Sequence, residues 1–315
     1  MLPVSEALVE TSDFVARRVV DVGLQDGAVV RLRVYGRGPR LVVSHGNGLA
    51  IEAYRPFWSL FVDRHEVVVF DFRHHGLSTP YQGPMQNWPR FIADFGVVLA
   101  AIERELGAAD TVGVFHSMSA VTALLHASEH DTPWRGLLAF EPPTPPPSGH
   151  PEFEPFFDLH RDLAESAARR RPAFAAVEDL ATSFARTSSF RRMGPEALQR
   201  LAAATLRWNA VKGHYELACA REFESETFRL RHLEDAWART TSVSLPVCIL
   251  AGIPDPDENR CLSNVARSLA LNGGFAFQSV PDATHFLQLE RPRECAAIVD
   301  AFVARVLSTK GHDHV

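Results

Sequence analysis

Short apolar runs alternate along the chain with longer segments in which apolar residues recur every three or four positions. The segment 29–35 alternates between apolar and polar residues, which is typical of a strand with one exposed face. Six further runs of mainly apolar residues are predicted strands: 41–43, 67–70, 112–115, 136–140, 247–250 and 275–280. Most of these runs are continuous, as in parallel strands that are buried on both faces. We therefore predict a central, mostly parallel sheet.

Helical periodicity is clearest in two segments. The segment 91–106 carries apolar residues at helical spacing. Near the end of the chain, Val299, Phe302 and Val306 follow the same rule, and Pro292 stands at a favourable first-turn position. Strands that alternate with helices predict an α/β fold, in which helices flank the sheet.

The alternation stops at residues 142–147, of which five are proline. Proline interrupts helices and central strands. The next strand begins near Ser244, and the roughly one hundred residues between are too many for an unstructured loop. Their pattern predicts helices at about 153–170, 172–187, 195–208 and 221–240. We predict a core formed by residues 1–141 and 245–315, and a helical lid, residues 142–244, over the functional site.

Composition narrows the range of partners and locations. The 315 residues are 46% hydrophobic and 22% charged, which is ordinary for a globular chain. The net charge of −6 disfavours a nucleic-acid partner, because phosphate binding needs a basic face. No apolar run approaches the roughly 20 residues that span a membrane, and the first ten residues, with two glutamates and no basic residue, do not resemble a signal peptide. We expect a cytoplasmic protein with reduced cysteines.

The chemistry of the chain is indicated by a serine just after a predicted strand. The apolar run ends at Phe115, Ser117 follows, and a stretch of small and apolar residues with helical character begins at Ser119. A sharp turn between strand and helix lifts a serine hydroxyl above the sheet and aims the helix N-terminus at the reaction centre. We predict that Ser117 is a nucleophile; the alternative is a serine that caps the helix.

This turn departs from the usual nucleophile elbow, G-x-S-x-G. Phe115 and Ser119 stand at the two positions where that motif has glycine. Serine is small enough for the tight turn, whereas nothing in the sequence explains how phenylalanine fits. Ser119 is a poorer candidate nucleophile than Ser117, because Val121 would then stand at the second small position.

Four other segments complete a recognisable set. One predicted strand leads to Asp255, and the last predicted strand leads to His285. Upstream, the segments 44–48 and 71–78 each follow a predicted strand. The order serine, aspartate, histidine, together with these two loops, resembles the α/β-hydrolase family along nearly the whole chain. The resemblance implies a mostly parallel sheet flanked by helices, with a helical lid inserted before the last two strands.

The resemblance also implies a role for each of these residues. Ser117 would attack the substrate, His285 would carry the proton, and Asp255 would orient the imidazole. Two other carboxylates remain open as the orienting acid: Asp257, and Glu141 at the end of the strand before the lid.

The same resemblance indicates which groups hold the substrate. The backbone N–H groups of Asn47 and Met118 would form the oxyanion hole, and Gly46 and Gly48 would let their loop approach the substrate closely. The predicted lid is rich in aromatic residues, of which three are candidates for the substrate pocket: Phe156, Phe157 and Trp208. They suggest a small-molecule substrate with an apolar group.

We therefore expect a serine hydrolase that cleaves a carboxylic ester or a lactone through an acyl-enzyme, with no metal or other cofactor implied. Three alternatives remain: a C–C bond hydrolase of a diketone-type ring-cleavage product, an acyltransferase, and a non-catalytic ligand-binding protein on the same fold. An aspartate nucleophile is missing, which argues against dehalogenase and epoxide-hydrolase chemistry. The sequence predicts neither the individual substrate nor the oligomeric state.

Overall fold

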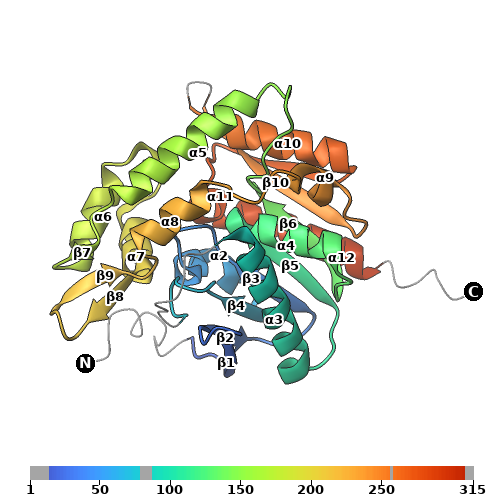
Figure 1. Cartoon of the computed structure of the whole chain (residues 1–315). Helices are drawn as coiled ribbons and strands as arrows, with labels where there is room; N and C mark the ends of the chain where they lie inside the picture. Colours follow the sequence, from blue (N-terminus) through green and yellow to red (C-terminus); the bar gives the residue numbers. More distant parts are fainter. Residues whose placement is uncertain (1–13, 79–86, 256–257, 309–315) are drawn as a thin grey trace, which may run out of the picture.

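A computed structural model describes residues 14–78, 87–255 and 258–308. Its centre is an eight-stranded sheet with the strand order β1-β2-β4-β3-β5-β6-β10-β11 (Figure 1). The strands are β1 (Arg18–Gly23), β2 (Val29–Tyr35), β3 (Arg40–Ser44), β4 (Glu66–Phe70), β5 (Thr111–His116), β6 (Trp134–Phe140), β10 (Val247–Ile253) and β11 (Ala276–Pro281). The pairs β1·β2 and β2·β4 are antiparallel, and the other neighbours are parallel. The predicted mostly parallel sheet is confirmed.

The hydrophobic pattern does not predict β1. This strand pairs with β2 alone, at the edge of the sheet, and most of its side chains are exposed. An edge strand has one open side and no second layer to bury it, so its residues need not be apolar.

Helices cover both faces of the sheet. On one face, apolar side chains of the sheet pack against α3 (Trp88–Leu106), α4 (Met118–Glu129) and α10 (Cys261–Gly273). On the other face they pack against α2 (Arg55–Trp58) and α12 (Pro292–Ser308). Three short helices contribute to the same cluster: η1 (Ile51–Tyr54), η2 (Ser59–Phe61) and α11 (Leu287–Glu290). Helices α3 and α12 confirm the two predicted from periodicity. No helix within the described ranges is long and apolar enough to cross a membrane.

A long insertion lies between β6 and β10. Its elements are α5 (Phe153–Ala168), β7 (Ala173–Phe174), α6 (Val177–Ala185), η3 (Ser188–Phe190), α7 (Pro195–Thr205), β8 (Leu206–Asn209), β9 (His214–Leu217), α8 (Arg221–Phe228) and α9 (Ala236–Thr241). The prediction of helices alone is wrong, because β7, β9 and β8 form a small antiparallel sheet. Strand pairing joins residues distant in sequence, so the spacing of neighbouring residues does not reveal it.

Hydrogen bonds to backbone carbonyls hold the insertion against the core. The guanidinium of Arg207, in β8, donates to the carbonyl oxygens of Gly76 (2.7 Å) and Ser78. The indole N–H of Trp88, at the start of α3, donates to the carbonyl oxygen of Thr227 in α8 (3.3 Å). These contacts place the insertion beside the loops that follow the parallel strands (Figure 1), which is where open α/β sheets bind ligands.

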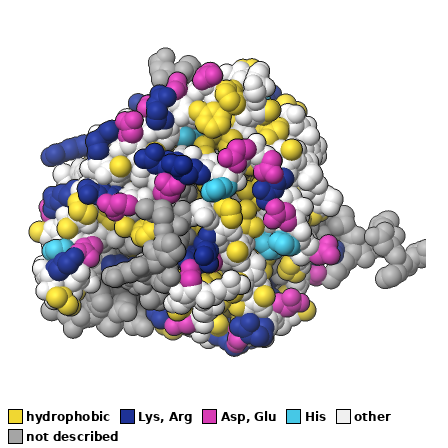
Figure 2. Space-filling view, in the orientation of Figure 1, with side chains coloured by type: hydrophobic (Ala, Val, Ile, Leu, Met, Phe, Trp, Pro, Cys, Tyr) yellow, Lys and Arg dark blue, Asp and Glu magenta, His cyan; other side chains and the backbone are white. Residues whose placement is uncertain are grey.

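Charged side chains of both signs are interspersed on the surface seen in Figure 2. Three consecutive arginines of the insertion each pair with a carboxylate: Arg169 with Glu165, Arg170 with Glu224 and Arg171 with Asp179. This arginine run is therefore neutralised locally and does not form an unpaired basic patch.

Candidate active site

Ser117 stands at a strained turn between β5 and α4. Its φ of 52° and ψ of −117° are unusual for a residue with a side chain, and such conformations typically cost about 1–3 kcal/mol. The Ser117 N–H donates to the carbonyl oxygen of Phe140 in β6 (2.9 Å), which fixes the turn to the neighbouring strand. The Ser117 side chain makes no capping hydrogen bond to α4. It lines a cavity instead, which disfavours the capping alternative.

The room for Phe115 comes from Gly113, two residues earlier on the same face of β5. A Cβ atom on Gly113 would lie 2.5 Å from Cε2 of Phe115 and 2.5 Å from Cδ2 of Leu137. The Phe115 ring packs edge-on against Phe95 and Trp134, with ring centroids 5.3 and 5.7 Å apart. The turn thus accepts phenylalanine because a glycine earlier in the strand supplies the space.

Ser119 holds the backbone of the turn together. Its hydroxyl donates to the carbonyl oxygen of His116 (2.9 Å) and accepts from the N–H of the same residue (3.0 Å). The side chain is fully buried. Because this hydroxyl is committed to the backbone, Ser117 is the serine of the turn that faces the cavity.

His285 is hydrogen-bonded to Glu141. The Nδ1 atom of His285 lies 2.8 Å from Oε2 of Glu141. A carboxylate only accepts, so Nδ1–H donates and Nε2 keeps a lone pair. The other carboxylate oxygen, Oε1, accepts from the N–H of Gly252 (2.8 Å) and from the hydroxyl of Ser263 (2.9 Å). With three donors and an exposed fraction of 1%, the Glu141 carboxylate is fixed in place.

The register of the sheet explains why Glu141 reaches this position. His116, at the end of β5, pairs with Phe140, at the end of β6. The residues that follow them, Ser117 and Glu141, are therefore neighbours at the carboxyl edge of the sheet. An acid on the strand beside the serine needs to cross only one strand spacing, roughly 4.8 Å, to reach the same site.

The prediction that Asp255 contacts His285 is wrong, because Glu141 occupies the Nδ1 side of that imidazole. The Asp255 side chain is 58% exposed and pairs with Arg192 of the insertion (2.7 Å). β10 continues to Ile253, so Asp255 follows beyond the edge of the sheet and is carried to the surface. Asp257 lies outside the described residues.

Asn47 and Met118 both line the cavity at Ser117. Among the residues that the structure describes, no acceptor is paired with the backbone N–H of either. Gly46 allows the close approach, since a Cβ atom there would lie 3.1 Å from Cβ of Ser117 and 3.0 Å from Nδ1 of His116. Both residues therefore bring a backbone N–H without a partner in the described chain to the cavity that Ser117 lines.

Helix α8 of the insertion contacts the loop that contains Asn47 and Gly48. The side-chain amide of Asn47 donates to the carbonyl oxygen of Glu224 (2.9 Å). Gly48 has a φ of 70°, and a Cβ atom there would lie 2.5 Å from Oε1 of Glu224. Its N–H donates to Nε2 of His75 (3.1 Å). Gly48 thus lets the insertion approach the core and does not itself line the cavity at Ser117.

A buried chain of hydrogen bonds joins the loop of Gly46 to the loop of His285. Nε2 of His116 lies 2.8 Å from the carbonyl oxygen of His285, so Nε2–H donates. Nδ1 of His116 then accepts from the hydroxyl of Tyr54 (2.6 Å), whose oxygen accepts from the Gly46 N–H (3.3 Å). Burial holds the pKa of His116 well below its usual range and raises the pKa of Tyr54. The chain therefore positions both loops while it stays uncharged.

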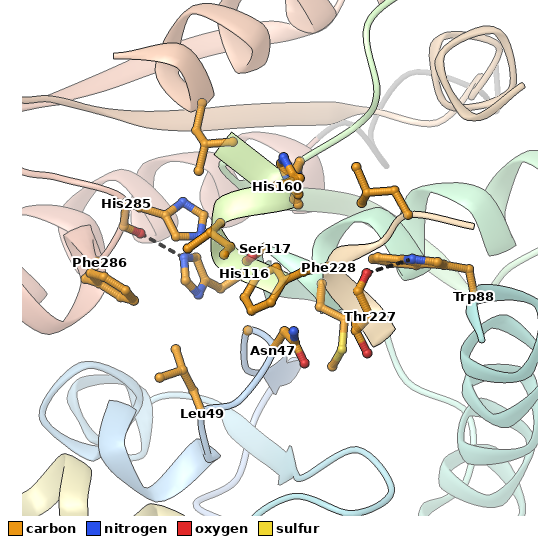
Figure 3. Close-up of a pocket in the computed structure, with 16 residues that line it drawn as sticks. Asn47, Leu49, Trp88, His116, Ser117, His160, Thr227, Phe228, His285 and Phe286 are labelled. Carbon is orange, nitrogen blue, oxygen red and sulfur yellow. Dashed lines mark hydrogen bonds between the residues drawn. The ribbon is translucent and has the colours of Figure 1, made fainter. Parts of the chain in front are cut away.

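The cavity at Ser117 has a volume of about 90 Å³ and is walled mainly by apolar side chains (Figure 3). These include Leu49, Trp88, Leu163, Phe228, Leu262 and Phe286. Sequence reasoning did not single them out, because they come from six separate segments that only the folded chain brings together. Within the described residues, no three histidine, cysteine, aspartate or glutamate side chains are grouped so that they could hold a metal ion.

The three aromatic residues predicted for the pocket lie elsewhere. Phe156 is buried and packs against the ring of His160, with 4.1 Å between ring centroids. Phe157 and Trp208 are 38% and 42% exposed, and Trp208 packs against Tyr215 in the small sheet. Aromatic content alone does not tell which face of an element points to the core, so this prediction is corrected.

Residues 41–298 match the model of the alpha/beta hydrolase family. The match covers most of the chain, and the strand order and the strained serine turn fit it. This chain is an α/β-hydrolase. A search among curated proteins found no matching sequence.

Solved structures of similar fold include three enzymes. E-2-(acetamidomethylene)succinate hydrolase has a TM-score of 0.71 and 18% identity, over 91% of this chain and 100% of that one. A thermophilic esterase from Thermogutta terrifontis has a TM-score of 0.67 and 18% identity, over 92% and 99%. The thioesterase domain from the curacin biosynthetic pathway has a TM-score of 0.68 and 17% identity, over 90% and 100%. At these identities the likeness is one of fold.

A second, larger cavity of about 360 Å³ adjoins the first in this α/β-hydrolase. Ser117 lines only the first cavity, and Glu141 lines only the second. Four residues line both: Leu163, Leu262, His285 and Phe286. The imidazole of His285 therefore stands at the junction of the two cavities.

Proposed function

We propose that this α/β-hydrolase cleaves a carboxylic ester or a lactone through an acyl-enzyme on Ser117. The observation that carries the proposal is the 2.8 Å contact between Nδ1 of His285 and the buried carboxylate of Glu141, at a cavity that Ser117 also lines. An imidazole with a carboxylate on Nδ1 and a lone pair on Nε2 is equipped to act as a general base.

In the proposed reaction, the Ser117 hydroxyl attacks the carbonyl carbon while Nε2 of His285 accepts the hydroxyl proton. The backbone N–H groups of Asn47 and Met118 donate to the oxyanion that forms. When the C–O bond to the alcohol breaks, His285 returns the proton to the leaving oxygen. A water molecule then attacks the acyl-enzyme with the same proton transfers, which releases the acid and restores Ser117.

We assign the orienting acid to Glu141 and not to Asp255. Glu141 keeps the Nδ1–H tautomer of His285 and stabilises the imidazolium that forms during the reaction. Its burial strengthens this interaction, since charges in a protein interior are screened less than charges in water. Within the part of the chain that the structure describes, Asp255 is exposed, pairs with Arg192 and makes no hydrogen bond to His285.

The solved relatives support acyl chemistry in a general way. An esterase and a thioesterase domain are among the structures of similar fold, and both of their names describe cleavage of an acyl bond. Helices α5 and α8 of the insertion contribute lining residues to the cavity. This supports the proposal that the insertion acts as the lid over the substrate.

The experiment that tests this function is hydrolysis of p-nitrophenyl esters of increasing acyl length by the wild type and by Ser117→Ala. We expect activity that disappears in the variant, with a preference for short acyl groups. Ser128→Ala is the control, because that hydroxyl donates to the carbonyl oxygen of Leu125 near the far end of α4 and does not line the cavity. It should remain active.

Labelling with a fluorophosphonate separates the alternatives. If the wild type is labelled at Ser117 but hydrolyses no ester or lactone, the reaction is of another kind, and a vinylogous 1,5-diketone becomes the substrate to test for C–C bond cleavage. Formation of a methyl ester on addition of methanol would indicate acyl transfer. A folded protein that is neither labelled nor active would contradict the proposal and favour a ligand-binding role.

A further inference from the structure

His160 is a buried polar residue of the insertion that reaches the cavity at Ser117. It lies on α5, it is 3% exposed, and it lines this cavity but not the adjoining larger one. In Figure 3 it lies on the opposite side of Ser117 from Asn47. No role in the reaction proposed above uses this side chain.

The hydrogen bonding of His160 fixes which ring nitrogen is free to accept. Nδ1 lies 2.8 Å from the carbonyl oxygen of Phe156, one turn earlier in the same helix. A carbonyl oxygen can only accept, so Nδ1–H donates to it. Nε2 then carries the lone pair, and no residue in the described part of the chain donates to it. Burial lowers the pKa of His160 to about 4, which keeps the ring neutral at ordinary pH.

The cavity that His160 lines is mainly apolar. Its walls include Leu163 on the same helix, with Phe228 and Leu262 on other elements. An acceptor that borders an apolar cavity without a donor is unfavourable. A ligand that supplies a donor at this point would remove that cost, whereas an apolar ligand would not.

The positions of the two cavities indicate which part of the substrate meets His160. In the proposed reaction His285 returns a proton to the leaving alcohol, so the alcohol lies on the side of His285. The larger cavity adjoins that side and is the natural site for it. The acyl group then occupies the smaller cavity, which Ser117, Asn47 and His160 line.

We propose that Nε2 of His160 accepts a hydrogen bond from the acyl group, so that the substrate is an ester or lactone with a small acyl chain that carries a hydroxyl or amide N–H donor. This inference rests on the proposed function. His160 is a specificity residue in this scheme: it selects the acyl group and takes no part in proton transfer.

The test compares pairs of esters that differ only in the donor. The first pair is p-nitrophenyl 3-hydroxybutanoate and p-nitrophenyl 3-methylbutanoate, in which a methyl group replaces the hydroxyl. The second pair is p-nitrophenyl N-acetylglycinate and p-nitrophenyl 4-oxopentanoate, in which a methylene group replaces the N–H. Each pair is measured with the wild type, with His160→Phe, which keeps a ring but no acceptor, and with His160→Gln, which keeps an acceptor.

We expect the ratio of kcat/KM between donor ester and matched ester to fall by about 10- to 100-fold from the wild type to His160→Phe in at least one pair, because the donor of the bound acyl group loses its acceptor. His160→Gln should retain part of that ratio. The pair that responds tells whether a hydroxyl or an amide N–H is preferred. Differences in the intrinsic reactivity of the esters cancel when one enzyme is compared with another.

If the kcat/KM ratio between donor ester and matched ester is the same in wild type and His160→Phe for both pairs, this inference is overturned. Activity that depends on Ser117 would still leave the proposed function standing.

Binding gives a readout that needs no turnover. Titration calorimetry with Ser117→Ala should show tighter binding of methyl 3-hydroxybutanoate or methyl N-acetylglycinate than of its matched ester, and the additional His160→Phe change should abolish the difference. Equal binding of both members of each pair would also overturn it.

Discussion

The replacement Glu141→Gln tests the reasoning about the site most directly. Oε1 of Glu141 accepts from the N–H of Gly252 and the hydroxyl of Ser263, so the glutamine oxygen will take this place. The amide NH₂ must then face Nδ1 of His285, 2.8 Å away in the native arrangement. An amide nitrogen donates, so Nδ1 has to accept and the imidazole proton moves to Nε2.

That tautomer cannot take the proton of Ser117. Loss of the orienting carboxylate in a serine triad lowers kcat by about 10⁴, which corresponds to about 5.5 kcal/mol of transition-state stabilisation at 1.36 kcal/mol per factor of ten. The assay is p-nitrophenyl ester hydrolysis at saturating substrate, with urea unfolding to establish that the variant is folded. We expect kcat to fall by about 10³ to 10⁴ with a much smaller change in KM.

Asp255→Asn is the matched control, since it makes the same chemical change on the acid that the sequence favoured. Its side chain is 58% exposed and pairs only at the surface, where such pairs contribute about 0–1 kcal/mol. We expect activity close to that of the wild type. If Glu141→Gln stayed within tenfold of wild type while Asp255→Asn lost activity by a thousandfold, the assignment of the acid would be refuted.

Three further predictions concern the elements around the site. Tyr54→Phe removes the hydroxyl that links the Gly46 N–H to His116. We expect kcat to fall by roughly tenfold with little loss of thermal stability. An unchanged kcat in steady-state kinetics would contradict a positioning role for Tyr54. Gly113→Ala places a Cβ atom 2.5 Å from the Phe115 ring, and the overpacking should destabilise the fold by about 1–3 kcal/mol in urea unfolding, with partial recovery in Gly113→Ala/Phe115→Leu. Burial lowers the pKa of His126 and of His160 to about 4. Between pH 6.5 and 4 the unfolded chain therefore binds protons that the folded chain does not. The free energy of unfolding should fall as pH falls, by up to about 1.4 kcal/mol per pH unit for each group. His160→Gln should make this slope shallower, and an identical slope in urea unfolding at pH 7, 6 and 5 would argue against a neutral His160.

Comparison of sequence and structure shows which features local chemistry reveals. Ser117 could be found because a strand, a break and a helix follow one another within a few residues, and such short-range patterns depend on the sequence itself. The parallel sheet could be predicted for the same reason, since runs such as 67–70 and 112–115 are continuously apolar only when both faces are buried. The loop of Asn47 and the loop of His285 were placed by their positions after strands.

The acid, the pocket and the fit of Phe115 depended on neighbours that are distant in the chain. Glu141 and Asp255 both follow strands, and the register of β5 against β6 and the length of β10 decide which of them reaches His285. Phe115 fits because its ring lies over Gly113 and beside Phe95 on another element.

The residues that line the cavity also depended on tertiary structure more than on local sequence. The aromatic residues of the insertion were apparent in the sequence, but Phe157 and Trp208 are partly exposed and do not line the cavity. His160, whose spacing is unremarkable in the sequence, does line it. Sequence by itself determined the order of the core strands from β2 onward, the two long core helices and the turn that carries Ser117, because hydrophobic period and turn chemistry act between near neighbours. Tertiary structure decided which acid, which walls and which polar groups meet at Ser117, because packing and strand register join residues that no local pattern connects.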